Sequence, residues 1–154
     1  MIVSLYRDIK AFFQNSSFIN HGNIPDGFLF IGAQPNIEVS FYNCIMGSSI
    51  SSAFPLVTIN AIKSVNLENV IFGDVVGTLQ PIIQFSIIFD FVSIKNLTVN
   101  NVSGTSAGVS DIIVFTNFPQ TITVLEQIHM FNLSLDGIAA IRSNSELDQI
   151  QIID

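Results

Sequence analysis

A polar residue recurs along the chain every 26 to 31 residues, each time between alternating apolar positions. Most residues four and two positions before it, and three positions after it, are apolar. This alternation predicts two short strands that meet at a bend, each with one buried face. The polar residues are Asn15, Asn43, Asn69, Asn96 and Gln127, and a further step of 27 leads to Asp154.

A second apolar segment precedes each polar residue by 10 to 13 positions. Such a unit has no helical period and cannot bury its apolar face alone, but it can stack on copies of itself. Equivalent strands then lie parallel, about 4.8 Å apart, with like side chains in columns. The pattern predicts an all-β fold: one domain over residues 1–154, a parallel β-helix (β-solenoid) of about five to six coils with a 26–31-residue period. The six segments are Ile2–Leu5, Phe28–Ile31, Leu56–Ile59, Ile82–Phe85, Ile112–Phe115 and Ile138–Ile141.

Two other folds remain open at this point. Leu67–Phe72 and Ile94–Val99 match the strand half of a leucine-rich repeat, whose period of about 20 to 29 residues overlaps this one. The rest of that signature is missing, since Val75 and Val102 stand near the expected Asn and no helix-like segment follows. A sandwich or another all-β fold is the second alternative.

The segments Val65–Phe72 and Val92–Val102 resemble coils of the pectin-lyase-like family of right-handed parallel β-helices. The resemblance concerns the coil pattern and extends over essentially the whole chain. It implies a side-chain amide ladder at the bend, formed by Asn15, Asn43, Asn69, Asn96 and Gln127. An amide can take part in such a ladder because it carries both hydrogen-bond donors and acceptors.

Many members of that family cleave polysaccharides, an activity that would require paired carboxylates or an acidic metal cluster. Of the family's catalytic motifs, the sequence matches only the two residues His21-Gly22. His129 falls in a different column from His21, so the two histidines cannot bind one metal ion together. Glu68 and Glu126 share a column but lie two coils apart, about 10 Å by the strand spacing. We therefore expect no catalytic, cofactor-binding or metal-binding residues, and no cofactor.

Composition narrows the class of protein further. Hydrophobic residues make up 49% of the chain and charged residues 11%, which excludes a disordered chain. The formal net charge of −7 argues against nucleic acid as a partner. The most apolar stretch, Pro81–Val92, contains Gln84, Ser86 and Asp90 and is too short for a membrane span. The single cysteine, Cys44, allows no internal disulfide and is expected to be a small buried residue.

Four N-glycosylation sequons begin at Asn15, Asn96, Asn101 and Asn132. Asn101 and Asn132 both fall five residues after the bend, in a column of polar residues that we expect to face solvent. They are the favoured glycan sites, because a sugar on Asn15 or Asn96 would interrupt the expected ladder. N-linked glycans would place the chain outside the cell. Arg7, Asp8 and Lys10 interrupt any signal-peptide core at the N-terminus, so we expect either a cytoplasmic protein or a native chain that begins before residue 1.

These features together predict a non-catalytic extracellular β-solenoid with a structural, adhesive or filament-forming role. The chain is expected to be a section of a longer protein or a unit that stacks, because open β-helix ends invite its own copies or flanking coils. The alternative is a carbohydrate-binding or polysaccharide-cleaving β-helix related to pectin lyases, with carbohydrate as its partner.

Overall fold

The computed structural model describes residues 2–4, 9–20, 29–48, 57–78, 81–104, 111–116, 122–134, 140–143 and 149–153. All the regular structure in these ranges is β-strand. The strands are β1 (Ile2–Ser4), β2 (Lys10–Gln14), β3 (Ser17–Asn20), β4 (Leu29–Ser48), β5 (Val57–Thr78), β6 (Ile83–Gly104), β7 (Ile113–Thr116), β8 (Ile122–Ser134), β9 (Ile141–Ser143) and β10 (Gln149–Ile153).

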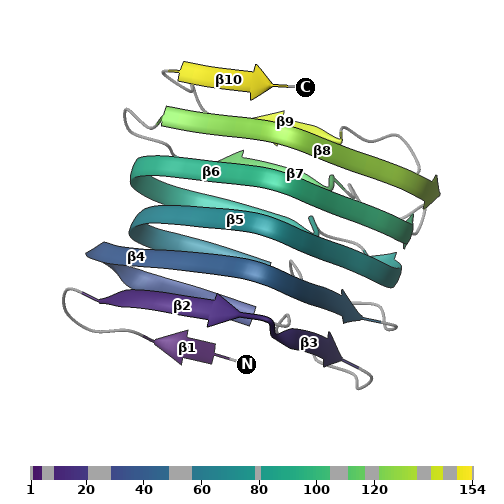
Figure 1. The fold of residues 1–154 in the computed structure, drawn as a ribbon, viewed down its shortest axis with the longest axis horizontal. Helices are drawn as coiled ribbons and strands as arrows, with labels where there is room; N and C mark the ends of the chain where they lie inside the picture. Colours follow the sequence, from purple (N-terminus) through teal and green to yellow (C-terminus); the bar gives the residue numbers. More distant parts are fainter. Residues whose placement is uncertain are drawn as a thin grey trace.

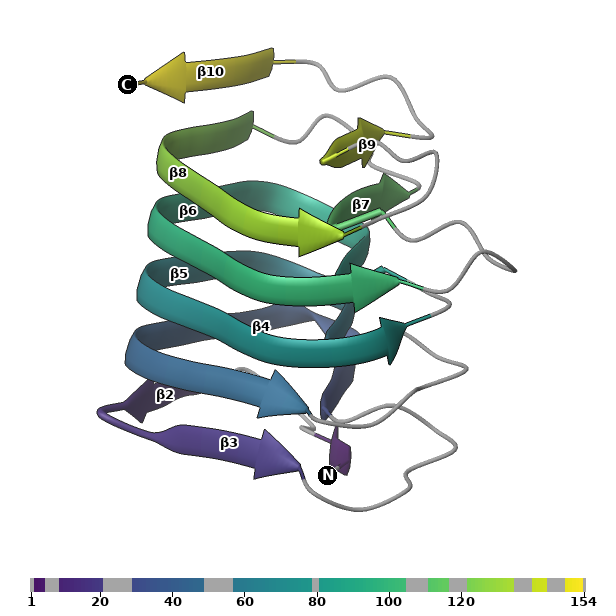
Figure 2. The ribbon, with the colours of Figure 1, turned by 90° about the vertical axis from the view of Figure 1, so that its right-hand side faces the viewer.

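The strands stack in parallel along one axis, as a β-solenoid (Figure 1). One path of paired strands runs β1–β4–β5–β6–β7–β9, while β2 and β3 also pair with β4, and β8 pairs with β6 and β10. The long strands β4, β5 and β6 each curve around several sides of the solenoid (Figure 2). The predicted all-β parallel β-helix is therefore confirmed, with β4, β5 and β6 as its three most complete coils in place of the five to six expected.

The register of the coils agrees with the sequence repeat. Phe13 pairs with Phe41, and the same column continues through the equivalent residues of the later coils. The register shifts between Gln34 and Glu38 in the β4–β5 pairing and between Ile62 and Ser64 in the β5–β6 pairing, so bulges absorb the differences in coil length. The column two residues before the bend is Phe13, Phe41, Leu67, Ile94, Leu125 and Ile152.

The interior consists of these inward columns. Phe13 stacks on Phe41 with ring centroids 4.7 Å apart, and Phe85 stacks on Phe115 at 5.2 Å. Cys44 is fully buried in the same core, as expected for a lone cysteine that acts as a small apolar residue. Because each inward side chain lies between its equivalents in the coils on either side, the core is continuous along the axis.

None of the residues described forms a helix that could cross a membrane.

Residues with left-handed backbone conformation produce the bends. Asn15, Asn43, Asn69 and Asn96 have φ values between 49° and 55°, and Gln127 has a φ of 54°. Asparagine adopts this region more readily than other residues that carry a Cβ. The chain therefore changes direction at the polar residue of each repeat.

The side chains of this first bend column are hydrogen-bonded in series. Asn43 Nδ2 donates to Asn15 Oδ1 at 3.1 Å, Asn69 Nδ2 to Asn43 Oδ1 at 3.0 Å, and Asn96 Nδ2 to Asn69 Oδ1 at 2.7 Å. Gln127 lies at the same bend, but among the described residues this series of hydrogen bonds reaches only as far as Asn96. The amide groups thus link four successive coils with one polarity.

A second polar series follows five residues later in each coil. Asp74, Asn101 and Asn132 have φ values of 55°, 51° and 53°. Asn101 Nδ2 donates to Asp74 Oδ1 at 3.0 Å, and Asn132 Nδ2 donates to Asn101 Oδ1 at 3.2 Å. The polarity is the same as in the first series. Asp74 accepts at its start, a position that a carboxylate, which lacks donors, can occupy.

Asn69 is the residue at which the contribution of the first series can be measured. We expect Asn69→Ala to lower the free energy of unfolding by about 2 kcal/mol, because it removes two hydrogen bonds and replaces asparagine by a residue that adopts positive φ less readily. Asn69→Gly removes the same hydrogen bonds but tolerates the φ, so we expect about half that loss. Urea unfolding checks both variants, and equal stability of the wild type and both variants would contradict the ladder's role.

Candidate functional site

The outward face of the solenoid between residues 10 and 126 carries half of the charged side chains that the structure describes. Inward side chains of these strands are buried, while the outward ones alternate with them. We define the outer face as the outward side chains of residues 10–14, 38–42, 64–68, 91–95 and 122–126. Its first column is Lys10, Glu38, Ser64, Phe91 and Ile122; its middle column is Phe12, Ser40, Asn66, Ser93 and Val124; its third column is Gln14, Tyr42, Glu68, Lys95 and Glu126.

A groove of about 570 Å³ lies on this face, across four coils. Ser40, Asn66 and Ser93 from the middle column line it together with larger side chains of the two flanking columns. Phe12 contributes an aromatic ring that is 65% exposed. Short side chains between longer ones produce the hollow, which combines apolar and polar groups.

The aromatic residues in this groove are held by neighbouring coils. The rings of Phe12 and Tyr42 are stacked, with centroids 6.4 Å apart and an angle of 15° between their planes. Asn66 Nδ2 donates to Tyr42 Oη at 2.9 Å, which restrains the phenol. Phe91, 37% exposed, lies in the first column of a later coil. The groove thus presents restrained rings beside hydroxyl, amide and charged groups.

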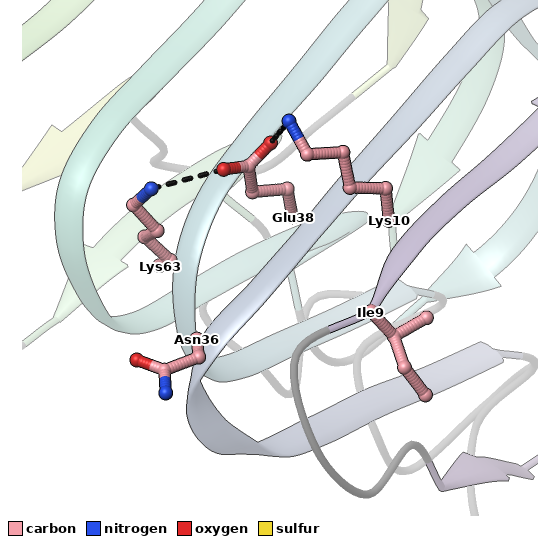
Figure 3. A pocket seen from close by; sticks show the side chains of 5 residues that line it. All are labelled: Ile9, Lys10, Asn36, Glu38 and Lys63. Carbon is pink, nitrogen blue, oxygen red and sulfur yellow. Dashed lines mark hydrogen bonds and ion pairs between the residues drawn. The ribbon is translucent and has the colours of Figure 1, made fainter.

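A second hollow of about 390 Å³ adjoins the groove and shares Lys10 and Glu38 with it (Figure 3). Lys10 Nζ lies 2.8 Å from Glu38 Oε2, and Lys63 Nζ lies 2.9 Å from Glu38 Oε1. Asn36 and Ile9 complete the lining. Lys63 lies at a register shift: it is the single residue between Ile62 and Ser64 in β5, where β4 has three residues between Gln34 and Glu38.

The three charged residues of this hollow form one electrostatic unit. Hydrogen bonds from Lys10 and then Lys63 hold the pKa of Glu38 below its ordinary value of 4.5. At neutral pH the carboxylate is therefore ionised, and the unit carries a net charge of +1. The chain as a whole has a formal net charge of −7, and its three lysines all belong to this hollow or the adjoining groove.

The structure places the two acids that share a column, Glu68 and Glu126, on either side of Lys95. Lys95 Nζ lies 3.1 Å from Glu126 Oε2. His129 is exposed in a different part of the solenoid, and His21 lies outside the described residues. Within the described ranges, no three or more His, Cys, Asp or Glu side chains gather in a way that could hold a metal ion.

The four sequon asparagines all lie in one of the two hydrogen-bonded columns. Asn101 and Asn132 are exposed, but the Nδ2 of each donates to the preceding coil, as the Nδ2 of Asn96 does. Asn15 accepts from Asn43 through its Oδ1. The sequence predicted a ladder at Asn15 and Asn96 and only a solvent-facing column at Asn101 and Asn132. Both columns form ladders, so this difference does not distinguish the two pairs of sequons.

Sequence reasoning missed the groove, the second hollow and the second ladder. Part of the signal was available: Lys10 and Glu38 both stand five residues before a bend residue, so the repeat already placed them side by side. Lys63 gave no such signal, since it stands six residues before Asn69, beside the register shift between β4 and β5. No family model, curated protein or solved structure matches the chain.

The lowered pKa of Glu38 predicts a stability difference that depends on pH. A carboxyl whose pKa is lowered by folding stabilises the fold above its unfolded pKa, and this stabilisation is lost as the pH falls through the folded pKa. We expect Glu38→Gln to be less stable than the wild type at pH 7, by no more than about 1 kcal/mol for each ion pair. The difference should decrease below the ordinary pKa of 4.5 and vanish once Glu38 is protonated.

Urea unfolding between pH 2.5 and pH 7 measures this difference. The same Glu38→Gln substitution in a Lys10→Met, Lys63→Met background is the control, and there the pH dependence should largely disappear. A wild-type difference that persists unchanged to the lowest pH would contradict the assignment.

Proposed function

We propose that this chain is a non-catalytic extracellular β-solenoid with a structural role, adhesive or filament-forming. One observation carries the proposal: polar side chains of neighbouring coils are joined to one another, many of them at equivalent positions. The amide series at both bends, the Lys10–Glu38–Lys63 unit and the Lys95–Glu126 pair all run along the axis. Such bonds hold a stack of coils together.

The pair between Asp111 and Arg142 follows the same principle. Arg142 Nε lies 3.0 Å from Asp111 Oδ2, and the Asp111 side chain is only 4% exposed. A nearly buried carboxylate must be paired, because an uncompensated charge in the interior is strongly destabilising. Here too the pair joins two neighbouring coils, which supports a role for the chain as a rigid stacked element.

The extracellular location and the N-linked glycans are part of the proposal. The sequons and the sparse surface charge support them, with Ser, Thr and Asn in place of charged groups. A glycosylated amide keeps one N–H, so a sugar on Asn101 or Asn132 must share Nδ2 with the ladder hydrogen bond. Glycosidase treatment of the chain secreted from a eukaryotic host tests for N-linked glycans, since a mass loss is expected.

The coil pattern also supports kinship with the pectin-lyase-like solenoids.

Filament formation can be tested at β10. Ile152 belongs to the inward column and pairs with Leu125, yet it is 74% exposed. We expect the wild type to associate as its concentration rises, because a second copy stacked over β10 would bury this apolar side chain. Ile152→Lys should abolish the association, while Ile122→Lys, on the outer face of the same region, should leave it intact.

Sedimentation velocity and electron microscopy measure this association. Rods of constant width are expected for the wild type and for Ile122→Lys. A wild-type chain that stays monomeric at every concentration would contradict the filament-forming role.

A carbohydrate-binding function is the second candidate, and the groove of the outer face favours it. Sugars present both apolar C–H faces and hydroxyls, and the groove offers the exposed ring of Phe12 beside Ser40, Asn66 and Ser93. Pockets that bind small polar ligands combine such apolar surfaces with a few fixed polar groups. The stacking of Phe12 on Tyr42 and the hydrogen bond from Asn66 would keep the rings in place before a ligand arrives.

Substitution of the aromatic residues tests this candidate. We expect Phe12→Ala and Tyr42→Ala each to weaken binding of a neutral oligosaccharide about tenfold, because aromatic anchors dominate the energetics of many binding sites. Phe131→Ala removes a ring that is 49% exposed outside the groove and is the matched control. Calorimetric titration with a panel of neutral oligosaccharides is the measurement. No binding by the wild type, or equal losses in all three variants, would reject the groove as a sugar site.

A further inference from the structure

The hollow around Glu38 has a charge opposite to that of the chain. Its two ammonium groups, from Lys10 and Lys63, lie on either side of one carboxylate, so it carries +1 in a chain of −7. Two of the five basic residues of the sequence thus line one cavity. Such a local excess of positive charge in a concave region attracts anions.

The arrangement of Glu38 disfavours a cation as the ligand. Both of its carboxylate oxygens already accept from a lysine, one at 2.8 Å and the other at 2.9 Å. The lysines are donors only, and Lys10, whose side chain is 67% exposed, uses one of its three N–H donors for Glu38. The Asn36 amide adds a further possible donor to the lining.

The size of the hollow indicates a ligand larger than an inorganic anion. About 390 Å³ lies within the usual range of small-molecule pockets, about 300 to 1,000 Å³. A single oxyanion would occupy only a fraction of this space, and the hollow continues into the groove through Lys10 and Glu38. A ligand that fits would carry an anionic group on a larger polar body.

We propose that the hollow lined by Lys10, Asn36, Glu38 and Lys63 binds an oxyanion group carried on a polar organic molecule. The two ammonium groups bind the oxyanion, and Glu38 holds them in place while competing with the ligand for their N–H donors. Carboxylate, sulfate and phosphate groups share this chemistry, since each accepts several hydrogen bonds from lysine. The proposal depends neither on the filament-forming role nor on the binding of neutral sugars in the groove.

Because Glu38 competes with the ligand for the lysine N–H donors, its removal and the removal of a lysine should have opposite effects on anion binding. Glu38→Gln removes the competing carboxylate and raises the charge of the hollow from +1 to +2. It should therefore tighten anion binding, by about three-fold to tenfold. Lys10→Met and Lys63→Met should each weaken binding by at least about tenfold, the usual effect of a charge-assisted hydrogen bond.

The experiment is a titration of the whole chain followed by NMR and calorimetry at constant ionic strength. The probes are glucuronate, glucose 6-phosphate, inorganic phosphate and uncharged glucose. We expect saturable binding of one or both charged sugars, tighter than that of inorganic phosphate, and no binding of glucose. The difference between glucuronate and glucose 6-phosphate distinguishes a carboxylate from a phosphate as the preferred group.

His129→Glu is the control for net charge. His129 is exposed outside the hollow, and the substitution changes the charge of the chain by about as much as Lys63→Met does. It should leave binding unchanged, and thermal unfolding of every variant checks that the fold is intact. The proposal is overturned if neither charged sugar binds the wild type, if Lys63→Met and His129→Glu weaken binding equally, or if Glu38→Gln weakens it.

Discussion

The parallel register between successive coils is the constraint on which the rest of this structure depends. Each coil contributes inward side chains that no single coil could bury, so the core exists only when equivalent residues stack. A slip of one residue would turn every inward side chain outward. The stacked rings of Phe13 and Phe41, and of Phe85 and Phe115, show how closely like residues meet in this register.

The two amide series, which lie on the surface of the solenoid, stabilise that register. Each asparagine donates to its equivalent in the preceding coil, so a shifted coil would lose its partner on both sides. The positive φ at the same residues makes them the points where the chain turns. One residue type thus serves the bend and the alignment of the coils, because the amide accepts the left-handed backbone and carries both a donor and an acceptor.

The same register determines what the surface can offer. Outward side chains of neighbouring coils stand about 4.8 Å apart in columns, so groups far apart in sequence meet on one face. Lys10, Glu38 and Lys63 come from three successive coils and form one charged unit. Phe12, Tyr42 and Asn66 do the same for the aromatic part of the groove. A chain with few charges can in this way concentrate them at a single place.

The sequence alone determined the fold class and the inward columns, because the alternation of apolar residues around each asparagine repeats in phase with the coils. Lys10 and Glu38 stand at equal distances from their bend residues, which was a signal for their pairing that the sequence-based prediction did not use. Only the tertiary structure decided which side chains meet at the bulges and which residues take a left-handed backbone at the bends. Lys63 stands at a register shift between β4 and β5 that no periodic pattern contains, and there it pairs with Glu38. Ile87 adopts a φ of 55° against the preference of a β-branched residue, between the pairs Asn60–Ser86 and Ile62–Ile88, at the same place in its coil as Ala61 with a φ of 52°. Local patterns determine which side chains face inward, whereas the outward site depends on how unequal coils are brought into one register.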